Sequence, residues 1–71
     1  MPEQGIYQHF RDRRLYQVLG IAKHSETLEP MVVYRALYGD YSLWTRPASM
    51  FDEMVAHEGR QVPRFRLMPA R

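Results

Sequence analysis

The residues of this 71-residue chain that are best suited to chemistry lie in one polar stretch, residues 24–30. His24, Glu26 and Glu29 could offer one nitrogen and two carboxylates to a divalent ion, but their spacing matches no strong metal signature. The His-x-Glu pattern also occurs in zinc deaminases, which need cysteine ligands that this chain lacks. Ser25 completes the residue types of a nucleophilic triad, yet sequence neighbours rarely reach the required geometry. We therefore expect a polar loop that hydrogen-bonds to its own backbone, with no catalytic centre, metal or cofactor. A small hydrolase or metal-binding protein remains the weaker alternative.

A second group of residues carries aromatic rings and guanidinium groups. Of the ten basic residues only Lys23 is lysine, and the pI is near 9.3. Arginine binds phosphate or carboxylate in planar, bidentate contacts, although base composition in a GC-rich genome also favours arginine, and a net charge of +2 is a weak field. Rings and guanidinium groups suit either unpaired bases with their phosphates or an extended peptide. The predicted binding surface consists of Tyr7, His24, Glu26, Arg35, Trp44, Arg46 and Arg64.

The size of the chain supports one domain, which we place at residues 5–68 between flexible ends at residues 1–4 and 69–71. Without cysteine there is no disulfide to stabilise so small a core, which leaves oligomerisation, for example a homodimer formed through free strand edges. No apolar run approaches the roughly 20 residues that span a bilayer, and the first residues do not resemble a signal peptide. We expect a cytoplasmic protein that does not bind membranes.

The first half of the chain reads as two strands. Residues 5–10 alternate between two faces, and residues 11–14 form a turn. The nearly continuous apolar residues of 15–23 indicate a strand covered on both faces, with Gly20 at a bend or bulge.

The clearest hairpin joins residues 31–37 and 41–46 through a two-residue turn at Gly39 and Asp40. That register pairs Tyr34 with Thr45 on a core face. On the other face it places Trp44 opposite Arg35, with Arg46 beside them. We therefore expect Trp44 to be partly exposed on a face intended for a partner.

The last third of the chain predicts a helical turn and a second hairpin. Residues 47–53 should form the turn, with Ser49 and Asp52 at the spacing of an N-terminal cap and with Met50 and Phe51 plugging one end of a barrel. Strands 54–57 and 62–68 then pair Val55 with Val62, and a bulge near Pro63 reconciles their conflicting patterns. Five to six short strands with one helical turn favour a small SH3-like antiparallel barrel over an OB-like barrel.

Several segments of the chain closely resemble a known bacterial family, catalogued as domain of unknown function 1653. They are Gly5–Phe10, Tyr16–Tyr34, Ala36–Tyr41, Leu43–Pro47 and Pro63–Phe65. The resemblance implies an SH3-like barrel that usually stands alone as a short protein, and it implies no activity. The chain departs from the family at residues 11–14, where a glycine-containing turn is usual. From the residues themselves we expect a non-enzymatic binding module whose partner is nucleic acid, or alternatively a peptide or protein in an assembly.

Overall fold

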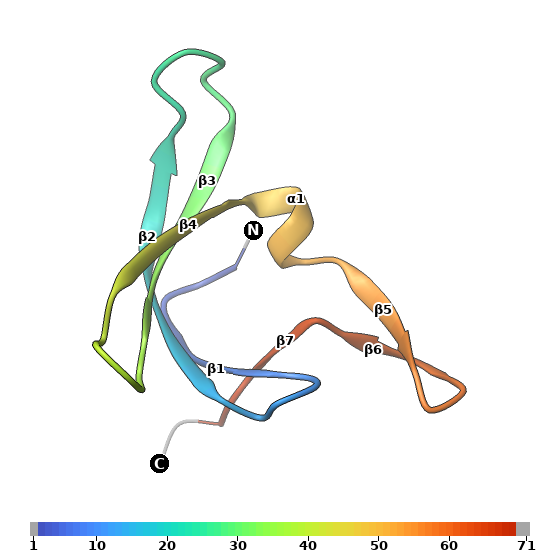
Figure 1. Cartoon of the computed structure of the whole chain (residues 1–71). Helices are drawn as coiled ribbons and strands as arrows, with labels where there is room; N and C mark the ends of the chain where they lie inside the picture. Colours follow the sequence, from blue (N-terminus) through green and yellow to red (C-terminus); the bar gives the residue numbers. More distant parts are fainter. Residues whose placement is uncertain (1, 70–71) are drawn as a thin grey trace.

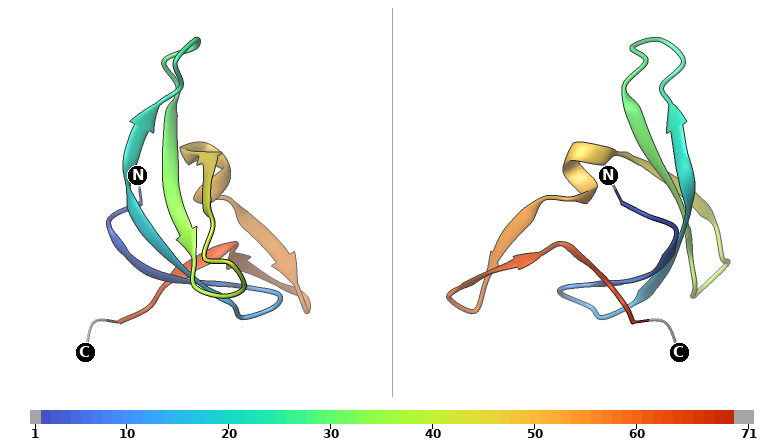
Figure 2. Two further views of the ribbon diagram at one scale, coloured as in Figure 1. Left: turned by 60° about the vertical axis from the view of Figure 1, so that its left-hand side comes forward. Right: turned by 180° about the vertical axis from the view of Figure 1, so that it is seen from behind.

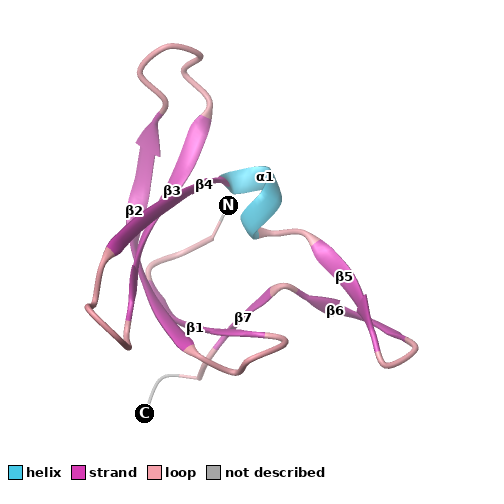
Figure 3. Cartoon of the chain, in the orientation of Figure 1, coloured by secondary structure: helices cyan, strands magenta, loops and turns pink. Residues whose placement is uncertain are grey.

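The computed structural model describes residues 2–69, which form a mainly β domain with one short helix (Figures 1 and 3). Its elements are β1 (Gly5–His9), β2 (Leu15–Lys23), β3 (Pro30–Ala36), β4 (Leu43–Pro47), α1 (Ala48–Phe51), β5 (Met54–His57), β6 (Arg60–Pro63) and β7 (Phe65–Leu67). Within these residues the strands form a five-stranded antiparallel sheet, in the order β4-β3-β2-β1-β7, and the separate hairpin β5-β6. The fold is the predicted SH3-like one, with the barrel left open between the edge strands β4 and β7.

A bulge in β2 bends the main sheet. Pairing with β3 passes from Val18 opposite Tyr34 to Gly20 opposite Val33, so Leu19 is the extra residue. An extra residue increases the local twist and allows one long strand to serve a curved sheet. Figure 2 shows the outcome, in which β2 and β3 rise together beyond the rest of the domain. The bulge predicted at Gly20 is confirmed.

The core is made mostly of aromatic rings from the concave side of the sheet and from α1. Its centre is Phe51, which is 1% exposed, stacks on Phe65 at 4.3 Å between ring centroids and meets the edge of Tyr7. The plugging role predicted for Phe51 is confirmed, but Met50 is 47% exposed. The helix starts at Ala48 and has four residues, so its buried residues are Ala48 and Phe51, three apart. The predicted Ser49 cap is also wrong, because Pro47 takes the N-cap position without any side-chain hydrogen bond.

The β3–β4 hairpin differs from the predicted register by one residue. The turn lies at Gly39 and Asp40 as expected, with the amide of Tyr41 donating to the carbonyl of Tyr38 at 3.1 Å. Tyr41 then adopts a left-handed conformation, φ 57°, and the ladder resumes with Leu43 opposite Arg35, followed by Trp44 opposite Tyr34. A shift of one residue turns every side chain of a strand to the other face of its sheet. Trp44 therefore lies on the Tyr34 side of the sheet, where the sequence predicted Thr45.

The second hairpin pairs as predicted, with Val55 opposite Val62. Its turn has positive φ at Glu58 and Gly59, 52° and 77°, as a type I′ turn requires. The predicted strand 62–68 is divided at Arg64, which gives the described part of the chain seven strands instead of five to six. The conflicting patterns near Pro63 arise because the chain leaves β5 there and joins β1 as β7.

The predicted flexible ends are only partly covered by the structure, because residues 1, 70 and 71 lie outside the described residues. Near the start, the hydroxyl of Tyr7 donates to the carbonyl of Glu3 at 2.9 Å, and the side-chain amide of Gln4 donates to the carbonyl of Leu19 at 2.9 Å. Across residues 2–69, α1 is a single turn, and no helix there has the length and apolarity to cross a membrane.

Candidate functional site

A hollow of about 210 Å³ opens on the concave side of the main sheet and has only aromatic residues in its lining within residues 2–69. We call it the aromatic hollow, and it is formed by Tyr16, Tyr34, Tyr38 and Trp44. These side chains meet because Trp44 lies opposite Tyr34 in the ladder while Tyr16 contacts Tyr34 edge-on at 5.6 Å. Tyr34 and Tyr16 are buried, whereas Trp44 is 54% exposed. The hollow thus has a packed tyrosine floor and an indole wall open to solvent.

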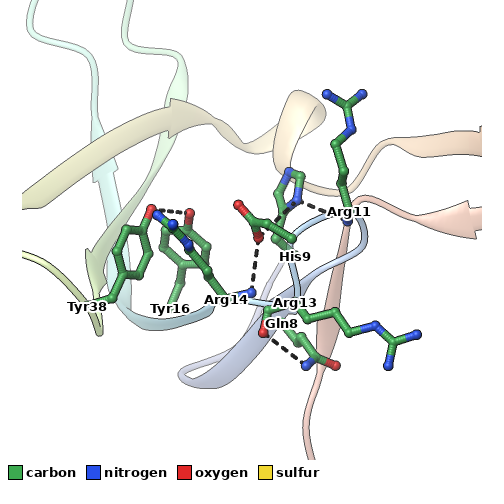
Figure 4. Close-up of polar contacts among 8 residues, drawn as sticks. Gln8, His9, Arg11, Arg13, Arg14, Tyr16 and Tyr38 are labelled. Carbon is green, nitrogen blue, oxygen red and sulfur yellow. Dashed lines mark hydrogen bonds and ion pairs between the residues drawn. The ribbon is translucent and has the colours of Figure 1, made fainter.

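Polar contacts fix the tyrosine side of the hollow. The hydroxyls of Tyr16 and Tyr38 share a hydrogen bond of 2.6 Å, and burial together with this bond raises the pKa of Tyr16 well above its ordinary value. The guanidinium of Arg14 lies 4.5 Å from the centre of the Tyr38 ring, and Figure 4 shows it beside the tyrosine pair. On β4, two residues beyond Trp44 on the same face, the guanidinium of Arg46 lies 5.6 Å from the Phe65 ring.

This arrangement is suited to holding a planar ring next to an anion. Exposed Trp44 and half-buried Tyr38 present aromatic surface, on which flat ligands stack. Arg14, over the ring of Tyr38, and Arg46, over the nearby ring of Phe65, supply positive charge in the neighbourhood. Among residues 2–69, no cluster of three or more His, Asp or Glu side chains is close enough to hold a metal ion. The chemistry on offer is therefore stacking and charge pairing.

The predicted surface residue Tyr7 lies in the core. It is 6% exposed, and burial, which outweighs its bond to the carbonyl of Glu3, raises its pKa. Its pairing with Tyr16 across β1 and β2 sets both side chains on the concave face. The sequence placed Tyr7 on the outer face because a single strand does not reveal which of its two alternating faces is covered.

The loop holding His24 and Glu26 lies at the far end of β3 from Trp44, at the top of Figure 1. The Nδ1 atom of His24 accepts the amides of Glu26 at 3.1 Å and of Thr27 at 3.3 Å, as expected for a loop that bonds to its own backbone. That nitrogen is therefore not free to bind a metal ion at the same time. The structure does not bring this loop together with the aromatic hollow.

The predicted arginines have different surroundings. Arg35 lies opposite Leu43, on the convex face of the sheet, so its predicted contact with Trp44 is wrong. Arg64 forms an ion pair of 2.7 Å with Glu53 and also joins its backbone, which makes it a link between β5 and the start of β7. Of the predicted residues, only Trp44 lines the hollow, and Arg46 follows it on the same face of β4.

Sequence reasoning missed Arg14 and the three tyrosines as members of the site. The sequence placed Tyr34 on a core face and Tyr16 in a strand covered on both faces, and it assigned Arg14 to a turn. A register that allowed for an extra residue at the turn would have placed Trp44 opposite Tyr34 and so revealed the hollow. Nothing local to residues 11–14 indicates that Arg14 lies over Tyr38.

The fold and this ring-lined hollow define a small SH3-like β domain. A family model described as a protein of unknown function, DUF1653, matches residues 5–67. The crystal structure of a DUF1653 protein from Bordetella bronchiseptica is 32% identical, covers 94% of this chain and 87% of that one, and has a TM-score of 0.85. The chain belongs to the DUF1653 family, as its sequence motifs predicted. No curated protein matches it.

Proposed function

We propose that this chain is a non-enzymatic module that binds single-stranded nucleic acid, with bases stacked in the aromatic hollow. The observation that carries the proposal is the exposed Trp44 beside a floor of tyrosines, with Arg14 over the ring of Tyr38 and Arg46 over the nearby ring of Phe65. Base stacking on aromatic side chains contributes about 1–3 kcal/mol per base and tolerates any base, since every base has a π-face. The flanking guanidinium groups suit the phosphates on either side of a stacked base.

A peptide is the second ligand class that an aromatic hollow on an SH3-like barrel can accept. A proline-rich peptide would use the rings but would leave the charges of Arg14 and Arg46 without a partner. Because these two cations lie over Tyr38 and Phe65, near the hollow, we favour a ligand that carries both rings and negative charge. Binding of a proline-rich peptide is the alternative result that the experiment below can detect.

The test uses Trp44 itself as the probe, because it is the only tryptophan in the chain. Titration with unlabelled single-stranded RNA or DNA should quench its fluorescence as bases stack on the indole. Trp44→Ala, followed by anisotropy of a labelled strand, should weaken binding about tenfold or more, given the stacking energy lost. Leu43→Ala is the matched control, since Leu43 is 55% exposed on the opposite face of the same strand.

The outcomes separate the two ligand classes. Nucleic-acid affinity should fall steeply as salt rises, because binding releases counterions, whereas docking of an uncharged peptide should change little. No quenching and no anisotropy change even at low salt would reject the proposal. Salt-independent binding of a proline-rich peptide, lost in Trp44→Ala, would replace it with the peptide module.

A further inference from the structure

A second, larger hollow lies on the other side of the β1–β2 turn, between that turn, β7 and the β5-β6 hairpin. Its volume is about 370 Å³, within the range of sites for small ligands. We call it the basic hollow, and its lining residues are Gln8, His9, Phe10, Arg13, His57, Arg60, Val62, Pro63 and Arg66. Three guanidinium groups and two imidazoles thus converge from segments that are distant in sequence. None of these lining residues is acidic.

The acidic residues near the basic hollow do not cancel its charge. Asp12 lies 3.6 Å from His9 and also accepts the amide of Arg14, so it serves the turn. Glu58 lies 3.8 Å from His57 but is 83% exposed at the tip of its hairpin. Neither acid pairs with an arginine of the hollow in the described structure. The cations are therefore available to an external anion.

The side-chain amide of Gln8 holds the guanidinium of Arg66 and the backbone of Arg13 in place. Gln8 on β1 donates to the carbonyl of Arg13 at 3.0 Å and accepts from the guanidinium of Arg66 at 3.3 Å. One amide side chain therefore connects two of the three arginine residues. Phe10 adds an apolar wall, with its ring 5.2 Å from that of His57. The hollow thus combines anchored positive charge with an aromatic edge, as a nucleotide unit requires.

We propose that the basic hollow binds the phosphodiester backbone, with one nucleotide unit, of the same strand that stacks in the aromatic hollow. The inference rests on the proposed function and extends it across the β1–β2 turn. Figure 4 shows two of the three arginines of this turn pointing to opposite sides, Arg14 toward Tyr38 and Arg13 away from it. A nucleic-acid strand that extends from the tyrosines therefore passes the guanidinium of Arg14 and then that of Arg13 before it reaches Arg60 and Arg66.

The test compares two variants that each remove one positive charge. Arg60→Gln acts in the basic hollow, where the Arg60 side chain has no internal hydrogen bond or ion pair in the described structure. Arg35→Gln acts on the convex face, away from both hollows. Both are measured with oligonucleotides of about 4 and about 12 nucleotides, which lie within the range of site sizes of small barrels. Thermal unfolding verifies that each variant is folded.

We expect Arg60→Gln to weaken binding of the longer oligonucleotide roughly fivefold. It should also lower the slope of log affinity against log salt by about 0.7, as loss of one phosphate contact requires. The short strand, which reaches only the aromatic hollow, should bind both variants like the natural chain. Equal effects of the two variants on the longer strand would overturn the inference while leaving the proposed function intact. Equally tight binding of a polyglutamate of matched charge would overturn it as well, since the hollow would then select charge alone. Absence of any strand binding to the natural chain would instead reject the proposed function, and the inference with it.

Discussion

Arg13 adopts a left-handed backbone conformation, φ 61°, at the point where its side chain enters the basic hollow. A residue with a Cβ in this region costs roughly 1–2 kcal/mol relative to glycine. The surrounding bonds maintain it, since the amide of Arg13 donates to the carbonyl of His9 at 3.1 Å and its carbonyl accepts from Gln8. Strained residues often lie at functional positions, where the surrounding structure holds the side chain in the conformation that its role needs. The β1–β2 turn thus supplies the hollow with a guanidinium from a left-handed residue.

Arg13 provides a prediction that separates stability from binding. Arg13→Gly and Arg13→Ala both remove the guanidinium, so both should weaken binding of the longer oligonucleotide to the same extent. Glycine relieves the backbone strain but loses more conformational freedom on folding, so the glycine variant should be more stable than the alanine variant by only up to about 1 kcal/mol. Urea unfolding measures the difference. An alanine variant more stable than the glycine variant would contradict the strain argument.

Tyr16 provides a prediction for alkaline pH. Burial, and then the hydrogen bond with Tyr38, raise its pKa in the folded chain, whereas the unfolded tyrosine ionises near pH 10. Above about pH 10 the unfolded state loses a proton that the folded state keeps, so stability falls as pH rises. Tyr16→Phe should lower the stability at pH 8 by about 1 kcal/mol through loss of the bond, and should make the alkaline decline shallower.

Urea unfolding at about pH 8 and about pH 10.5 measures both effects of Tyr16→Phe. Tyr41→Phe is the control, because Tyr41 is 53% exposed and should change neither value. An unchanged alkaline slope in Tyr16→Phe would show that its hydroxyl is not protected by folding.

At the scale of elements, alternation and turn chemistry were sufficient to predict most of the strands. The bulge at Gly20, the helical turn with Phe51 and the pairing of Val55 with Val62 follow from local patterns. The register of β3 and β4 did not, because one left-handed residue, Tyr41, lengthens the turn. Since a single residue reverses the faces of a strand, the predicted grouping of Arg35 with Trp44 failed along with the register.

The two hollows were predictable to different degrees. Trp44 is partly exposed as predicted, although its neighbour is Tyr34 rather than Arg35. The basic hollow had no local signal, because Arg13, Arg60 and Arg66 belong to three separate segments. They converge only because the chain leaves β5 at Arg64 and then pairs with β1. The alternation of apolar and polar residues does not predict this long-range pairing.

The short helix makes a prediction about the core. Phe51 is 1% exposed between Tyr7 and Phe65, so Phe51→Ala should cost about 3–5 kcal/mol in unfolding free energy. Met50→Ala changes the neighbouring residue of the same helix, which is exposed, and should cost less than about 0.5 kcal/mol. Chemical unfolding followed by circular dichroism compares the two variants. Equal losses would mean that α1 does not anchor the core through Phe51.

At the scale of the whole molecule, a 71-residue domain is expected to have only about 4–10 kcal/mol of stability. Within the described residues, β4 and β7 are edge strands of the main sheet, and β4 exposes Leu43, Trp44 and Thr45. The homodimer predicted from the sequence would use such an edge, and light scattering over a range of concentrations tests it. Pairing of two copies along β4 would compete with ligands at Trp44. Dimerisation and binding of a nucleic-acid strand should therefore oppose each other.

Because the domain is small, ligand binding should have a large effect on its melting temperature. A ligand at about 100 times its Kd stabilises the folded state by about 2.7 kcal/mol, and 1 kcal/mol corresponds to about 4–8 °C for a domain of this size. A saturating strand of about 12 nucleotides should therefore raise the Tm by roughly 10 °C or more. The rise should shrink sharply in Trp44→Ala, which loses the exposed ring, and persist in Leu43→Ala, which loses an exposed side chain from the other face of β4. Differential scanning calorimetry at low salt makes the comparison. A rise of the same size in both variants would mean that the strand binds the folded domain somewhere other than the aromatic hollow.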